Sequence, residues 1–81
     1  MGSKLRIKPG LLERLRETRK IASEEHQARL MGVHRTTLRR VDDGEQPSAA
    51  FMAAMYDAFG LGLGEAFEFV DEEPVSRRAA A

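Results

Sequence analysis

The 81-residue sequence contains no cysteine, no tryptophan and no long hydrophobic run. Without cysteine, disulfides and thiolate zinc sites are excluded, which suits a reducing cytosol. The longest apolar run is far below the roughly 18 residues that span a bilayer, and no secretory signal pattern opens the chain. We therefore expect a cytoplasmic protein that makes no membrane contact. The first three residues, Met-Gly-Ser, are candidates for a cloning remnant.

The net charge is zero, but the charges are segregated along the chain. Residues 1–20 carry a net +5, residues 21–41 a net +2 and residues 42–73 a net −9. A polyanion should therefore meet the N-terminal half and be repelled from the other end. The acidic half is in turn a candidate surface for a basic protein partner. A chain this short forms one domain of marginal stability, which a partner subunit would increase.

Hydrophobic periodicity and capping residues predict a compact all-α domain of five helices, with no internal repeat. Leu11, Leu12 and Leu15 mark the buried side of the first helix, and Phe51, Met55 and Phe59 mark that of the fourth. The first helix is expected to open at Pro9 or Gly10. The second runs from its N-cap Ser23 to Met31, and the third from about His34 to Asp42. The fourth extends from its N-cap Ser48 to Gly60, and the fifth covers residues 63–70.

Both ends of the chain are expected to lie outside this domain, which we place at residues 9–70. Residues 1–8 alternate basic and apolar side chains, which is compatible with a short strand, but a flexible basic arm is the favoured interpretation at a terminus. Residues 71–81 are charged and alanine-rich beyond Pro74 and are expected to form a disordered tail.

Residues 28–44 are the most informative stretch, because they predict two short helices joined by a glycine turn. Ala28 allows close approach of the helices, and Gly32 can take the positive φ of a sharp helix exit. Val33 and Leu38 would then fill the angle between the helices, and Val41 would continue the buried side one turn later. Four side chains remain exposed on the second helix, namely Arg35, Thr36, Arg39 and Arg40. This is the pattern of a helix-turn-helix whose second helix enters the DNA major groove.

Residues 22–67 resemble the helix-turn-helix domain of the phage repressor, Cro and Xre-type regulators. The resemblance is carried by Glu24, Ala28, Gly32-Val33, Leu38, Asp42-Asp43-Gly44, Pro47-Ser48 and the downstream Phe51-Met52, Met55, Phe59-Gly60-Leu61 and Glu65-Ala66-Phe67. It implies a lambda-repressor-like fold, a bacterial or phage origin and sequence-specific binding of double-stranded DNA. The chain departs from the family at Glu24, where glutamine is usual, at Gln27, where an aliphatic residue is usual, and in the acidic loop 43–46.

The resemblance also implies roles for individual side chains. Arg35, Thr36 and Arg39 are the expected base contacts, because an arginine fork suits guanine O6 and N7 and a threonine methyl suits thymine. A solvated helix face is the plainer interpretation of the same cluster. His34 is either a structural N-cap or a phosphate donor, and Arg40 binds phosphate or pairs with Asp42 or Asp43. Thr37, Lys4, Arg6 and Lys8 complete the expected backbone or supporting contacts.

The end of the expected fifth helix is a candidate dimer surface, formed by Phe67, Phe69 and Val70. Phe69 falls off the buried stripe, so it either contacts a second subunit or folds back on its own core. The resemblance favours a homodimer, which would place two copies of the recognition helix about 34 Å apart on a palindromic operator.

Other chemistry is weakly indicated. His26 and His34 lack the i, i+4 spacing of a metal pair, and Gly60-Leu-Gly-Leu-Gly64 lacks the spacing of a phosphate-binding loop. We expect no metal, no cofactor and no enzyme. The sequence thus predicts a DNA-binding transcriptional regulator, most simply a repressor. The competing class is a protein-interaction module of the same fold, such as an antitoxin or an adaptor of a regulator, with weak or no specific DNA binding.

Overall fold

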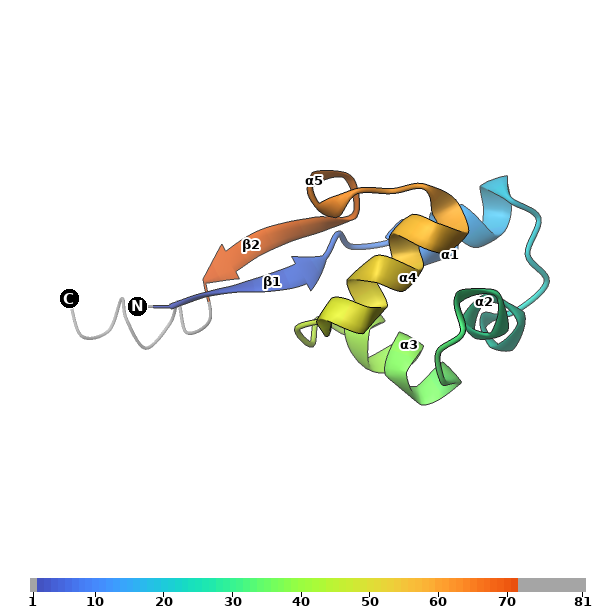
Figure 1. Cartoon of the computed structure of the whole chain (residues 1–81), viewed down its shortest axis with the longest axis horizontal. Coiled ribbons are helices and arrows are strands. Elements are labelled where there is room, and N and C mark those ends of the chain that lie inside the picture. The colour runs from blue at the N-terminus through green and yellow to red at the C-terminus, as the bar shows by residue number, and fades with distance from the viewer. Residues whose placement is uncertain (1, 72–81) are drawn as a thin grey trace.

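A computed structural model describes residues 2–71, which form five helices and a two-stranded antiparallel hairpin (Figure 1). No helix in that part of the chain is long and apolar enough to cross a membrane. The elements in chain order are β1 (Ser3–Ile7), α1 (Leu11–Thr18), α2 (Glu24–Met31), α3 (Arg35–Asp42), α4 (Ala49–Phe59), α5 (Leu63–Ala66) and β2 (Phe67–Asp71).

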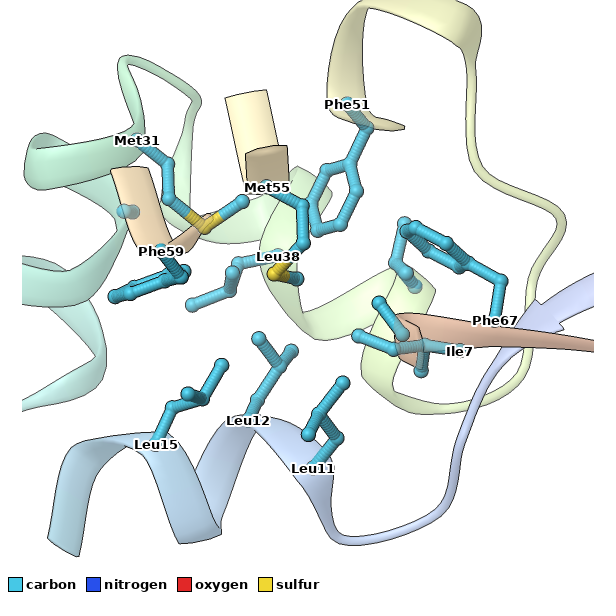
Figure 2. Close-up of a cluster of buried hydrophobic side chains, with 13 residues drawn as sticks. Ile7, Leu11, Leu12, Leu15, Met31, Leu38, Phe51, Met55, Phe59 and Phe67 are labelled. Atoms are coloured by element: carbon cyan, nitrogen blue, oxygen red, sulfur yellow. The ribbon is translucent and has the colours of Figure 1, made fainter. Parts of the chain in front are cut away.

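The core is organised by one side of α4, as the periodicity predicted. Phe51, Met55 and Phe59 follow one another at one-turn spacing and are all buried. Figure 2 shows them facing the leucines of α1 and the side chain of Leu38 on α3. The buried apolar cluster consists of Ile7, Leu11, Leu12, Leu15, Ala28, Met31, Leu38, Val41, Phe51, Met55, Phe59, Ala66 and Phe67.

The helix boundaries predicted from capping residues are confirmed. The Ser23 hydroxyl accepts a hydrogen bond from the His26 N–H at 3.1 Å, and the Ser48 hydroxyl accepts one from the Phe51 N–H at 3.1 Å. Gly60 ends α4 in the left-handed conformation, with φ of 72°.

The expectation of a purely all-α fold is wrong, because the two ends of the domain pair as strands. Ile7 lies opposite Phe67 and Leu5 lies opposite Phe69 in the antiparallel register. Ile7 is fully buried and Phe67 is only 3 % exposed, so the base of the hairpin belongs to the core. The preference for a flexible arm at residues 1–8 is therefore also wrong, since burial of Ile7 and pairing with β2 fix residues 3–7 in the strand alternative.

Helix α5 is correspondingly shorter than expected. It ends at Ala66, and the segment predicted to continue it to Val70 is β2. The strand pairs with β1 along one edge and directs Phe67 into the core, where its ring meets that of Phe51 edge-on, with the ring centroids 6.4 Å apart. Of the tail expected at 71–81, Asp71 ends β2 and the remainder lies outside the described residues.

The buried position of Ile7 gives a test of the hairpin. We expect Ile7→Val to lower the free energy of unfolding by about 0.5–1.5 kcal/mol, because it removes one methylene group from a filled core. Urea denaturation followed by circular dichroism measures this change. The same substitution at Ile21, which is only half-buried, is the matched control and should cost less. Equal stabilities for Ile7→Val and the unsubstituted chain would mean that β1 does not pack on the domain.

Candidate nucleic-acid interface

The turn between α2 and α3 has the geometry predicted for a tight helix exit. Gly32 adopts φ of 73°, a left-handed conformation that favours glycine. The Val33 N–H donates to the Ala28 carbonyl at 3.0 Å, and the Gly32 N–H donates to the Arg29 carbonyl at 3.1 Å. These are the two hydrogen bonds of a Schellman motif, and they fix the direction in which α3 leaves the turn.

Helix α3 is anchored by its inner side. Leu38 and Val41 are buried in the core, and Val33 is half-buried against it. Ala28 is also buried, which permits the close contact of α2 with α3. Of the five structural positions expected from the sequence, four lie in or against the core, whereas Gly32 is exposed in the turn. The opposite side of α3 faces outward.

The outward side of α3 carries the basic cluster. Arg35, Thr36, Arg39 and Arg40 are all exposed, whereas Thr37 is half-buried. Among the described residues, neither Arg35 nor Arg40 forms an ion pair, so the pairing of Arg40 with Asp42 or Asp43 is absent there. Two guanidinium groups of α3 are thus available to an external anion.

Arg39 differs, because it is paired with an acidic residue of the preceding helix. Its Nε lies 3.3 Å from Oε1 of Glu24, in the first turn of α2, with the arginine side chain 62 % and the glutamate side chain 33 % exposed. An ion pair this exposed contributes about 0–1 kcal/mol. The sequence showed no acid between Glu25 and Asp42, but the fold brings Glu24 against the cluster from the other helix.

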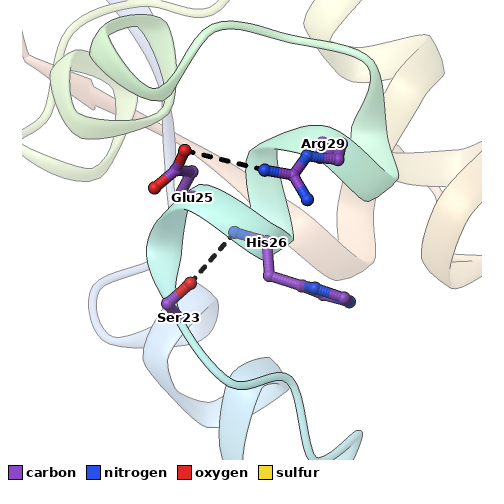
Figure 3. A network of polar contacts seen from close by, with 4 residues as sticks. All are labelled: Ser23, Glu25, His26 and Arg29. Atoms are coloured by element: carbon purple, nitrogen blue, oxygen red, sulfur yellow. Dashed lines mark hydrogen bonds and ion pairs between the residues drawn. The ribbon is translucent and has the colours of Figure 1, made fainter.

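Beside this face, the surface is hollowed between α2 and the start of α3. The hollow has a volume of about 480 Å³ and is lined by Glu25, Ala28, Arg29, Val33, His34 and Arg35. Glu25 and Arg29 form an exposed i, i+4 ion pair at 3.6 Å at its edge, next to the Ser23 cap (Figure 3). His34 occupies the N-cap position of α3, but its side chain makes no capping hydrogen bond.

The basic residues of the N-terminal segment lie on or next to β1, which contacts α3. Lys4, Arg6 and Lys8 are half-buried rather than carried on a free arm. The Arg6 Nε donates to the Ile7 carbonyl at 3.1 Å. A methyl group placed on Gly44 would lie 3.8 Å from the Arg6 guanidinium carbon, so this arginine borders the loop that follows α3.

Two further arginines serve the fold, a role that sequence reasoning missed. Arg16 donates at 2.7 Å to the side-chain oxygen of Gln27, whose amide nitrogen donates at 3.1 Å to the Leu12 carbonyl. Gln27 is fully buried, and both ends of its amide are satisfied, which explains how the core accommodates a polar side chain at this position. Arg19 donates at 3.1 Å to the Phe59 carbonyl and lies over the Phe59 ring.

The three residues expected at a dimer surface have different environments. Phe67 is part of the core, Val70 is half-buried, and Phe69 is 76 % exposed. Of the three, Phe69 alone presents a large apolar surface. The acidic elements α5 and β2 lie on the side of the domain away from α3 (Figure 1). In the register of the strands, Glu68 of β2 lies directly opposite Arg6 of β1.

No protein-family model, curated protein or solved structure matches this chain.

Asp42, the last residue of α3, gives a pH-dependent prediction. Burial raises the pKa of its carboxyl group above the ordinary value of 3.8; the positive charge of Arg16 opposes this effect, and Asp43 and Glu24 reinforce it. The folded state thus holds this proton more tightly than the unfolded state does. The stability that the protonated carboxyl group of Asp42 contributes is therefore lost as the pH rises through the raised pKa. The stability of Asp42→Asn relative to the unsubstituted chain should therefore increase as the pH rises from below 3.8 through the raised pKa of Asp42, and stay constant above it.

Thermal unfolding at a series of pH values measures this difference. Asp43→Asn, which neutralises the exposed neighbour, is the control for the change in net charge. A stability difference for Asp42→Asn that does not vary with pH would rule out the assigned origin.

Proposed function

We propose that this protein binds duplex DNA sequence-specifically and controls transcription, most simply as a repressor. In this proposal α2 and α3 form a helix-turn-helix of the phage repressor, Cro and Xre type, and α3 lies in the major groove. The observation that carries it is the exposed basic side of α3 on a helix whose other side is anchored by Leu38 and Val41. A rigid helix with outward arginines has the shape and charge that groove recognition needs.

The proposed base contacts are Arg35, Thr36 and Arg39. Arg35 and Thr36 are the first residues of α3, at the end that enters the groove. Arg39 follows one turn later and reaches base edges once its pair with Glu24 has opened. An arginine fork directed at guanine and a threonine methyl at thymine would supply the sequence preference.

The surrounding residues are proposed to hold the DNA backbone. His34 stands beside the hollow between α2 and α3, with a ring free of capping bonds. Arg40 lies on the exposed side of α3, and the half-buried Thr37 is a further backbone or supporting contact. Lys4 and Lys8 would act from the hairpin, and Arg6 from beside the loop after α3. Such contacts fix position on the duplex without reading sequence.

The protein is proposed to act as a homodimer on a palindromic site. Two copies of α3 would then occupy successive major grooves about 34 Å apart. The two-fold symmetry of the protein would be matched by that of the operator.

A protein-interaction module with weak or no specific DNA binding is the second candidate. The pair between Glu24 and Arg39 favours it, because a carboxylate beside the basic face opposes phosphate. The acidic α5 and β2 would then bind a basic protein. A chain that binds DNA through α3 and a basic partner through this other side is an intermediate case.

Arg35→Ala tests the proposal, because Arg35 has no ion pair among residues 2–71. Duplexes with a randomised centre are selected for binding to the unsubstituted chain, and affinities for the selected and random duplexes are measured between about 50 and 200 mM salt. We expect Arg35→Ala to weaken binding to the selected duplex by about 1–3 kcal/mol and to relax the preference at one base pair.

Arg14→Ala is the matched control, since Arg14 is exposed on α1 and is not part of the α3 face. It should leave the sequence preference unchanged. A chain that enriches no sequence and shows no salt-dependent binding would be a protein-interaction module rather than a DNA-binding regulator.

Glu24→Gln should strengthen DNA binding by about threefold at low salt, because it removes an exposed charge and releases Arg39. Glu25→Gln changes the same charge one residue away, where the partner is Arg29 instead of an α3 arginine. The effect at Glu24 should exceed that at Glu25 in the same binding assay. Equal effects would mean that the ion pair with Arg39 does not influence the interface.

A further inference from the structure

The outer edge of β2 is an open strand edge. The Lys8 N–H donates to the Ala66 carbonyl across the base of the hairpin at 2.9 Å, while the Leu5 N–H points away from β2 to Gln46. Because hydrogen-bonded and non-hydrogen-bonded pairs alternate in an antiparallel ladder, the Leu5–Phe69 pair is non-hydrogen-bonded. The N–H and C=O of Phe69 therefore point outward, and no residue of the described chain binds them.

The corresponding edge of β1 is covered. The Gln46 side-chain oxygen accepts the Leu5 N–H at 3.3 Å, and Gln46 belongs to the loop that follows α3. Strand β1 also contacts α3 itself. Within residues 2–71, no such side-chain hydrogen bond occupies the edge of β2 at Phe69.

The open edge carries an exposed aromatic residue. Phe69 is 76 % exposed although it lies on the same face of the hairpin as the buried Phe67. The start of β1 and the end of β2 extend away from the helices (Figure 1). A two-stranded ribbon is marginal in water, whereas four strands with a shared apolar face are stable. An unpaired edge with an exposed aromatic side chain is a template for strand addition.

We propose that a second copy of this chain pairs with β2 along this edge, strand antiparallel to strand, with the two-fold axis at Phe69. The two Phe69 residues would exchange both backbone hydrogen bonds, and their rings would lie side by side on one face. The two hairpins would thereby join into one four-stranded sheet. The inference concerns only the contact between two copies and does not depend on binding of DNA by α3.

The charges on the strands favour this register. Pairing about Phe69 places Glu68 opposite Val70 of the other copy, so no two like charges face each other there. A symmetric pairing of β1 about Leu5 would instead place Lys4 opposite Arg6 and displace Gln46. Like charges directly opposite one another destabilise a sheet.

The oligomeric state of the whole chain, without DNA, tests the proposal. Sedimentation velocity over a range of concentrations should show a dimer, and Phe69→Lys should weaken dimerisation by at least about 10-fold, because it places a charge on the edge and removes the aromatic contact. Tyr56→Lys is the matched control, since Tyr56 is an exposed aromatic residue of α4 beside the apolar hollow formed with Leu61 and Leu63. It should leave the dimer intact.

A cross-link reports the register directly, because the chain contains no cysteine. Cα atoms of a hydrogen-bonded antiparallel pair lie about 5.5 Å apart, within the range of a disulfide. In a glutathione redox buffer, Phe69→Cys should form a covalent dimer and Tyr56→Cys should not. A monomer at every concentration, or a dimer that Phe69→Lys leaves intact and that cross-links through Tyr56→Cys, would overturn the proposal. Neither outcome bears on DNA binding by α3, which the affinity measurements decide separately.

Discussion

The packing against Phe51 and Met55 on α4 is the contact on which the rest of the fold depends. Figure 2 shows Leu38 of α3 and the side chains of α1 converging on this side of α4, and Phe67 approaching Phe51 from β2. The core therefore fixes both the orientation of α3 and the base of the hairpin. The exposed arginines contribute little to their own placement, because α3 is held by its opposite side.

The features that the sequence predicted well are local ones. Ser23 and Ser48 cap helices through bonds to amides three residues away, and Gly32 and Gly60 end helices by their own backbone conformation. Signals of this kind need no knowledge of distant parts of the chain. For the same reason the inner positions of α3 were correctly identified from periodicity alone.

The features that were missed depend on segments far apart in the sequence. Residues 4–7 and 67–69 alternate apolar and polar side chains, but each segment is too short to distinguish from a helix end or an arm. Phe69 carried a usable signal, because it did not fit the helical stripe and lies two residues from Phe67, the spacing of one strand face. The ion pair of Glu24 with Arg39 likewise arises only when α2 is packed across α3.

The charge of the N-terminal half therefore overstates what a polyanion meets at the surface. Arg16 and Arg19 are engaged with Gln27 and the end of α4, and Arg39 is engaged with Glu24. The last of these engagements differs in kind. An exposed ion pair is worth about 0–1 kcal/mol, whereas a bidentate contact with a base is worth about 1–3 kcal/mol. Glu24 would thus be a weak competitor for Arg39, and a matching base pair would displace it. A mismatched site offers no such contact, so the ion pair between Glu24 and Arg39 would stay closed and the site would gain less binding free energy.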